Sequence, residues 1–260
     1  MLLPGLAWAQ PSRDWAAARS PSAPPSRIIG SHTNGCIAGA VALPQEGPGF
    51  LVVRPSRNRY YGHPTLTAFV TGFAGRAQAA GFQPLWIGDL GQPRGGPLPF
   101  GHSSHQIGLD ADIWLDLGPK SAERERIDTP SLVLPGETAV DPDRFTPRHA
   151  ALIRLAAESP GVERIFVNFT IKRALCGPHR GEAWMRRVRP WYGHDSHMHV
   201  RLGCPAGSPD CIAQSPVPAG DGCDAGLDWW FSAEARRPAP RPPGPPPRLP
   251  AACASVLIGR

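Results

Sequence analysis

Residues 101–115 read GHSSHQIGLDADIWL, and the second half of this stretch alternates between apolar and polar side chains. The apolar positions are Leu109, Ala111, Ile113 and Leu115. Between them stand Asp110, Asp112 and Trp114. A period of two predicts a strand whose apolar side faces a core. Two carboxylates on the opposite side of such a strand indicate a functional site.

A turn rich in serine and glycine precedes this strand and carries His102 and His105. His105 comes seven residues before Asp112, which leaves enough chain for the turn to fold back onto the strand. We therefore expect at least one of these imidazoles to lie beside the carboxylate.

A second group of histidines lies in the stretch WYGHDSHMHV at residues 191–200. His197 and His199 are two residues apart, so on a strand they share one face, while Met198 turns toward the core. His194 comes shortly before them.

Neutral imidazoles and a carboxylate are suitable ligands for zinc. A catalytic zinc takes three protein ligands and keeps a fourth position for water, whose pKa it lowers toward about 7. His105, Asp112 and one histidine of the 197/199 pair would make such a set. The other histidine would be free to handle a proton. The spacing alone leaves open which histidine takes which role.

The rest of the chain predicts a loop-rich α+β fold. The sequence has 260 residues, of which 33 are proline, and a proline removes one backbone hydrogen-bond donor. Helical spacing predicts helices over residues 64–80 and from Thr146-Pro147 to before Pro160. Short strands are expected at residues 85–87, 109–115, 164–167 and 198–202. We expect a single domain whose central antiparallel sheet carries the zinc site. No apolar run approaches the roughly 20 residues of a membrane span, which excludes a transmembrane protein.

Composition changes suggest four segments. Residues 1–9, MLLPGLAWA, end in an A-x-A pattern and are interpreted as a signal peptide remnant, unless the start codon is placed too late. Residues 10–27 are expected to be a flexible N-terminal arm and residues 28–235 the zinc domain. Residues 236–260, which are rich in proline, are expected to form a strap anchored by Cys253. An even number of cysteines, six, without a C-x-x-C pair favours disulfides and an exported protein.

The net charge of +6 has two explanations: the use of arginine for lysine in a GC-rich genome, or a polyanionic partner, either nucleic acid or an anionic cell-wall polymer. The basic residues are scattered, nearly all of them are arginine, and no nucleic-acid-binding motif is present. We therefore expect no nucleic-acid partner.

Several stretches resemble the penicillin-insensitive murein endopeptidases, which are secreted metallopeptidases of the bacterial cell wall. They are SHTNGCIAGAVALP at 31–44, RNRYYGHP at 57–64, QPRGGP at 92–97, GHSSHQIGLDADIWL at 101–115, RIFVN at 164–168, WYGHDSHMHVRLGCPAGSPDC at 191–211, GDGC at 220–223 and LDWWF at 227–231. The likeness covers roughly residues 28–233, and its two histidine motifs are highly specific.

The resemblance also implies roles for the histidines, because this family shares an H-(x)6-D and an H-x-H zinc signature with lysostaphin-type and D-Ala-D-Ala metallopeptidases. It implies His105, Asp112 and His199 as zinc ligands. His197 is then the base or the stabiliser of the transition state. His102 is a further ligand or a neighbour of the ligands, and His194 lines the site with His197.

By the same resemblance, the expected activity is periplasmic hydrolysis of D-alanyl–meso-diaminopimelyl crosslinks in peptidoglycan, without inhibition by penicillin. Arg94, Arg189 and Arg201 are candidates to hold substrate carboxylates in bidentate pairs. Three alternatives stay open: a catalytically inactive zinc-containing wall-binding module, a wall-anchored protein that stores metal, and a D,D-carboxypeptidase of the same superfamily.

Six cysteines allow fifteen connectivities, so the sequence by itself leaves the pairing open. The short loop with its prolines favours Cys204 with Cys211, and joining Cys36 to Cys253 would tie the tail to the body. The resemblance supports these two pairs together with the remaining one, Cys176 with Cys223.

Overall fold

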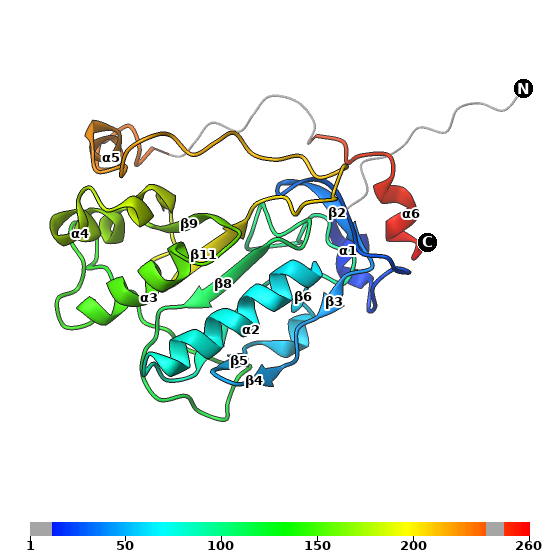
Figure 1. The fold of residues 1–260 in the computed structure, drawn as a ribbon, viewed down its shortest axis with the longest axis horizontal. Helices are drawn as coiled ribbons and strands as arrows, with labels where there is room; N and C mark the ends of the chain where they lie inside the picture. Colours follow the sequence, from blue (N-terminus) through cyan, green and yellow to red (C-terminus); the bar gives the residue numbers. More distant parts are fainter. Residues whose placement is uncertain (1–11, 238–246) are drawn as a thin grey trace, which may run out of the picture.

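A seven-stranded sheet runs through the protein in the order β10-β9-β11-β8-β7-β5-β4 (Figure 1). The computed structural model describes residues 12–237 and 247–260. The strands of this sheet are β4 (Glu46–Gly47), β5 (Phe50–Val52), β7 (Leu85–Ile87), β8 (Asp110–Trp114), β9 (Val162–Asn168), β10 (Val188–Trp191) and β11 (His197–Leu202). The four strands predicted from sequence are all present.

The sheet is antiparallel at its centre and parallel toward both edges. Strand β11 runs antiparallel to β8 and β9, and β7 runs antiparallel to β8. The outer pairs β10/β9 and β5/β7 are parallel, so the expected antiparallel sheet is confirmed only in its central part. The reason is that helices connect these outer strands, and a helical crossover returns the chain in the same direction. In the sequence, helix α2 (Pro64–Ala79) comes between β5 and β7, and helix α4 (Phe169–His179) comes between β9 and β10.

Two helices cover the apolar face of the sheet. Helix α2 begins at the N-cap His63, whose ring accepts from the Thr65 amide, with Pro64 at the first helical position. Helix α3 (Pro147–Ala157) begins with a capping box in which Thr146 and His149 bond each other's backbone amides. Both helices match their predicted ranges closely, and Figure 1 shows them lying along the sheet. Their buried side chains pack with those of β8, β9 and β11 in one core.

A second, smaller cluster holds the two ends of the described chain together. It contains Trp15, Ile29, Cys36, Cys253 and Val256. These residues come from helix α1 (Ser12–Ala17), the hairpin of β1 (Arg27–Ser31) and β2 (Asn34–Ala38), and helix α6 (Cys253–Leu257). The expected loose arm over residues 10–27 is therefore wrong for its described part, because Trp15 is fully buried.

The remaining elements are short: β3 (Val41–Ala42), β6 (Tyr61–Gly62), helix α5 (Ala225–Trp229) and the 3₁₀ helices Pro55–Arg57 and Ala183–Arg187. Strands β3 and β6 pair with each other. The predicted signal peptide remnant and residues 238–246 of the predicted strap lie outside the described residues. Among the described residues, no helix is long and apolar enough to cross a membrane.

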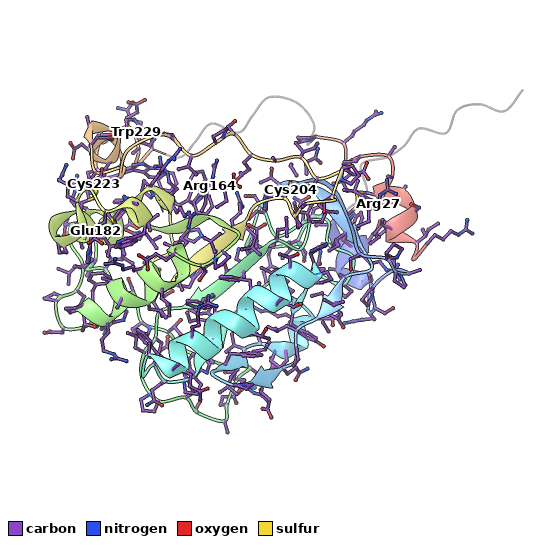
Figure 2. All side chains as sticks on the ribbon, in the orientation of Figure 1. Arg27, Arg164, Glu182, Cys204, Cys223 and Trp229 are labelled. Atoms are coloured by element: carbon purple, nitrogen blue, oxygen red, sulfur yellow. A yellow bond between two sulfur atoms is a disulfide. The ribbon has the colours of Figure 1, made fainter. Side chains whose placement is uncertain are left out.

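Three disulfides join the six cysteines in the predicted pairs: Cys36–Cys253, Cys176–Cys223 and Cys204–Cys211. Cys204 and Cys223 are labelled in Figure 2, near the long segment that follows β11. The bridges fix this segment and the C-terminal helix to the body of the domain.

Candidate metal centre

The face of the sheet opposite α2 and α3 carries the polar residues of the site. The cross-strand register places them in three neighbouring rows, namely Asp110–Arg201–Arg164, Asp112–His199–Phe166–Arg189 and Trp114–His197. Paired residues in adjacent strands point to the same side. The predicted alternation of β8 and β11 is confirmed, and the two histidine motifs meet on one surface.

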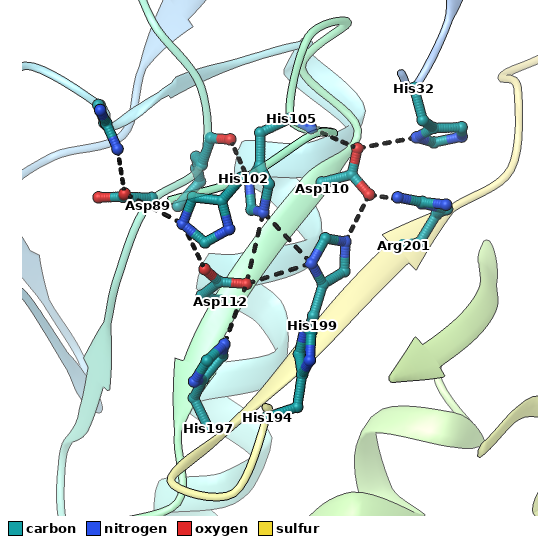
Figure 3. A network of polar contacts seen from close by, with 12 residues as sticks. His32, Asp89, His102, His105, Asp110, Asp112, His194, His197, His199 and Arg201 are labelled. Carbon is teal, nitrogen blue, oxygen red and sulfur yellow. Dashed lines mark hydrogen bonds and ion pairs between the residues drawn. The ribbon is translucent and has the colours of Figure 1, made fainter. Parts of the chain in front are cut away.

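Three potential ligand atoms converge where His105, from the turn before β8, meets Asp112 and His199 of the middle row (Figure 3). The Nε2 atom of His105 lies 3.2 Å from Nδ1 of His199 and 3.5 Å from Oδ1 of Asp112. The same Oδ1 atom lies 3.3 Å from Nδ1 of His199. All three side chains are almost completely buried.

The other ring nitrogen of each of these histidines has a defined partner. Nδ1 of His105 donates to the carbonyl oxygen of Leu90 at 2.6 Å. Nε2 of His199 donates to Oδ1 of Asp110 at 2.7 Å. A metal-binding histidine typically donates its second N–H to a carbonyl or carboxylate in this way, which leaves a lone pair on the nitrogen that faces the metal.

This arrangement fits a tetrahedral metal ion. A tetrahedron with ligand distances of about 2.0–2.1 Å has edges of about 3.3–3.4 Å, close to the three observed separations. Among the described residues, Oδ1 of Asp112 is buried without a hydrogen-bond partner. A buried carboxylate oxygen without a donor is costly, and a cation at this position would remove that cost.

His102 joins the group from the other side of Asp112. Ligand atoms of His102, His105 and Asp112 all lie within 4.8 Å of one another. Nε2 of His102 is 3.3 Å from Oδ2 of Asp112 and also 3.3 Å from Oδ2 of Asp89, which accepts from Arg59 at 2.7 Å. His102 therefore bridges two carboxylates and faces the Asp112 oxygen that His105 and His199 do not approach.

His197 and His194 stand at the edge of this group. Nε2 of His197 is 3.8 Å from Oδ1 of Asp112, and both of its ring nitrogens are buried without a hydrogen-bond partner among the described residues. The His194 ring centre is 4.9 Å from that of His197, and its Nδ1 donates to the Tyr192 carbonyl at 2.7 Å. Burial lowers the pKa of His197, and burial together with His197 lowers the pKa of His194 to about 4. Both rings are neutral near pH 7 and can accept a proton.

The buried carboxylates are held in their charged form. Burial opposes ionisation, but Arg201 and His32 keep the pKa of Asp110 well below its ordinary value, and His105 and His197 do the same for Asp112. Burial also opposes protonation of His105, yet the neighbouring carboxylates, above all Asp112, raise its pKa to about 9.

The pKa of His199 is shifted in the opposite direction from that of His105. Burial and the nearby His105 lower it to about 3. The facing nitrogens, Nε2 of His105 and Nδ1 of His199, are 3.2 Å apart, and the opposite pKa shifts favour a single proton between them, carried by His105. A metal ion would displace that proton, because both facing nitrogens must present lone pairs.

The turn that carries His105 and the turn that carries His194 both contain a strained backbone conformation. His105 has φ 65° and His194 has φ 53°, in the left-handed region that non-glycine residues seldom occupy. Such conformations concentrate at functional sites, where the surrounding structure enforces them. Gly108, at φ 71°, closes the turn of His105: an added Cβ would lie 2.8 Å from the amide nitrogen of His63, which leaves room only for glycine.

A cleft of about 370 Å³ opens beside the centre. Its lining comprises Thr33, Gly101, His102, Ser103, Ser104, Arg164, Phe166, Trp191, Tyr192, His194, His199, Arg201 and Gln214. A second cavity of about 720 Å³, near Trp184, contains none of the predicted site residues. The first cleft gives a ligand access to the His105–Asp112–His199 group.

The three arginines predicted to bind substrate lie at different positions relative to the cleft. Arg201 lines the cleft, but its Nε donates to Asp110 at 2.6 Å. Arg189 shares the middle row without lining the cleft. Arg94 is a correction: its guanidinium donates to the carbonyls of Ser20 and Leu257, so it secures the chain ends rather than the site.

Four residues of the site were not predicted, namely His32, Asp89, Arg164 and Phe166. The alternation of β8 predicted Asp110 on the same functional face as Asp112, but it did not predict that Asp110 holds His199. The strand at 164–167 was predicted, but only its register with β11 shows that Arg164 and Phe166 face the histidines.

Comparison with known proteins adds independent findings. A family model described as penicillin-insensitive murein endopeptidase matches residues 28–258. A protein of that name from Haemophilus influenzae is 47% identical over 235 residues, which cover 88% of this chain and 82% of the relative. Proteins of the same name from Klebsiella pneumoniae and Yersinia enterocolitica are 43% and 41% identical, each over 94% of this chain and 90% of the relative.

Proposed function

This chain belongs to the penicillin-insensitive murein endopeptidase family, and from this premise we propose that it is a zinc-dependent endopeptidase that hydrolyses D-alanyl–meso-diaminopimelyl crosslinks in bacterial peptidoglycan. The observation that carries the proposal is the convergence of three buried ligand atoms, from His105, Asp112 and His199, at separations that suit a tetrahedral ion.

His105, Asp112 and His199 would hold the zinc. Bound there, zinc would supply Lewis acidity, which polarises a scissile carbonyl and acidifies a water molecule. His102 orients Asp112 through the second carboxylate oxygen, 3.3 Å away, and Asp89 and Arg59 hold His102 in turn. One zinc per chain is expected.

His197 is the residue best placed to move protons. Its neutral ring has two buried, unpartnered nitrogens in the described structure and lies at the edge of the ligand group. It can take a proton from the attacking water and pass it to the leaving amine. His194, 4.9 Å away between ring centres, lines the same edge of the ligand group.

The proposed location is the periplasm. Three disulfides suit an oxidising compartment, and peptidoglycan lies outside the cytoplasm. A mechanism without a seryl acyl-enzyme offers β-lactams no nucleophile to trap, which accounts for insensitivity to penicillin.

The test is mass spectrometry of muropeptides after incubation with purified sacculi. We expect crosslinked dimers to become monomers, conversion to stop when the metal is chelated and to return with zinc, and penicillin to change nothing. Full activity after thorough chelation and dialysis would remove the metallopeptidase proposal. Release of free D-alanine from uncrosslinked stems would instead identify a D,D-carboxypeptidase, and zinc binding without turnover would identify a binding module.

A further inference from the structure

The cleft beside the proposed zinc site has two chemically different ends. Arg164 and Arg201 face each other across β9 and β11, one row from the ligands. At the other end, Trp191 and Tyr192 are 49% and 45% exposed although they are large aromatic residues. Phe166 and His199 lie between the two ends. A ligand that fills this cleft therefore meets cationic groups on one side of the centre and aromatic rings on the other.

The charge of Arg164 is not balanced by the protein. Its Nη2 donates to the carbonyl of Ser215, which fixes the guanidinium, but in the described part of the chain no carboxylate lies within 4.0 Å of it. Its Nε is buried and has no hydrogen-bond partner there. Arg201 differs, because its Nε bonds to the fully buried Asp110 at 2.6 Å. Arg164 is thus the cleft arginine that is still available to an anion.

A second guanidinium, that of Arg189, adds to the unbalanced positive charge of Arg164. Burial and the nearby Arg164 lower the pKa of Arg189, which stands beside Phe166 in the register. Arg189 does not line the cleft, but its guanidinium adds positive potential behind Arg164, which does, and an anionic group bound to Arg164 would relieve that potential.

We propose that Arg164 binds a free carboxylate of the substrate, namely the carboxylate of the diaminopimelyl residue whose nitrogen is released. This inference rests on the proposed function. In a D-alanyl–meso-diaminopimelyl crosslink, the carbon that bears the leaving nitrogen also bears a free carboxylate. The two rows of the sheet are separated by two residues of strand, roughly 6.5–7 Å, and an arginine side chain can span that distance. Guanidinium and carboxylate form the charge-assisted pair that arginine favours.

The test compares two synthetic crosslinked peptides that differ in one group. One carries the free carboxylate on the acceptor diaminopimelyl residue, and the other carries a carboxamide there. The zinc-loaded enzyme is used as wild type, as Arg164→Gln and as Arg154→Gln. Arg154 is the matched control, because it lies on α3, which packs on the apolar face of the sheet, and pairs there with Glu158 and Glu182. Zinc content and thermal unfolding verify that each variant is folded.

We expect wild type and Arg154→Gln to cleave the acid peptide with a kcat/KM about 10- to 100-fold higher than that of the amide, as befits a hydrogen bond to a charged group. Arg164→Gln should cleave both peptides at the low rate of the amide. Equal rates on both peptides by the wild type, or an unchanged ratio in Arg164→Gln, would overturn this inference and leave the endopeptidase proposal intact. Cleavage of neither peptide by the zinc-loaded wild type would remove both.

Discussion

His32 and Asp110 are 78 residues apart in sequence, yet Nδ1 of His32 donates to Oδ2 of Asp110 at 2.8 Å. The other oxygen of Asp110 accepts from Nε2 of His199 at 2.7 Å and from Nε of Arg201 at 2.6 Å. Asp110 is fully buried and receives three charge-assisted or ring N–H donors. It fixes the ring orientation and tautomer of His199, and His32 fixes Asp110 in turn.

His32 is therefore expected to tune a metal that it does not touch. His32→Leu removes one donor to Asp110 and should weaken zinc binding by about 10-fold, at the lower end of the effect of outer partners on metal sites. His32→Gln keeps a donor and should restore part of the affinity. Competition with a chromogenic chelator measures both, and His179→Leu, whose ring pairs with Glu182, is the control that should change nothing. Equal affinities for His32→Leu and the wild type would contradict this prediction.

The two histidines of the H-x-H pair should separate metal binding from turnover. His199→Ala removes a ligand atom and should abolish both zinc content and cleavage of sacculi. His197→Ala should retain one zinc per chain and lose about 100-fold or more in kcat, because it removes proton transfer. Elemental analysis and muropeptide kinetics distinguish the two. The roles would be reversed if His197→Ala emptied the site while His199→Ala stayed loaded.

The local part of this site was predictable from sequence, whereas its long-range part was not. The period of two in β8 and β11 places Asp112, His197 and His199 on polar faces without reference to any other strand. The position of His32 opposite Asp110 depends on how the β1–β2 hairpin docks, and no spacing along the chain encodes that.

The parallel edge formed by β9 and β10 was missed for a similar reason. Helix α4, which returns the chain for a parallel strand, includes the fully buried Lys172 and has Pro178 in its last turn. These residues interrupt the apolar periodicity by which a helix is recognised. Lys172 is satisfied by the carbonyls of Met185 and Asp221, which are distant in sequence.

Trp15 provides a test of the docked N-terminal segment. Its side chain is fully buried, and a Cβ added at Gly96 would lie 2.1 Å from its ring. Trp15→Ala should lower the free energy of unfolding by about 3–5 kcal/mol, whereas Arg13→Ala, at an exposed position on the same helix, should have little effect. Gly96→Ala should be destabilising in the wild type and less so beside Trp15→Ala, because the ring clash is gone. Chemical denaturation measures all four variants, and a neutral Trp15→Ala would show that the segment is detached in solution.

The disulfide between Cys36 and Cys253 should support the stability of the domain but not its chemistry. It closes a separation of 217 residues, for which the chain-entropy model gives roughly 5 kcal/mol as an upper value. Both cysteines belong to the small cluster with Trp15, whereas the proposed zinc ligands extend from β8, β11 and the turn before β8. The double variant Cys36→Ser/Cys253→Ser should therefore unfold at a lower denaturant concentration than the wild type. It should still hold one zinc and cleave sacculi at a rate within about twofold of wild type, when activity is measured well below its unfolding midpoint. Breaking Cys204–Cys211 in the same way is the comparison, because its loop of seven residues removes much less chain entropy and should shift the midpoint less. Loss of zinc from the folded Cys36→Ser/Cys253→Ser protein would show that the terminal cluster holds the β1–β2 hairpin, and with it His32, in the position that the metal site requires.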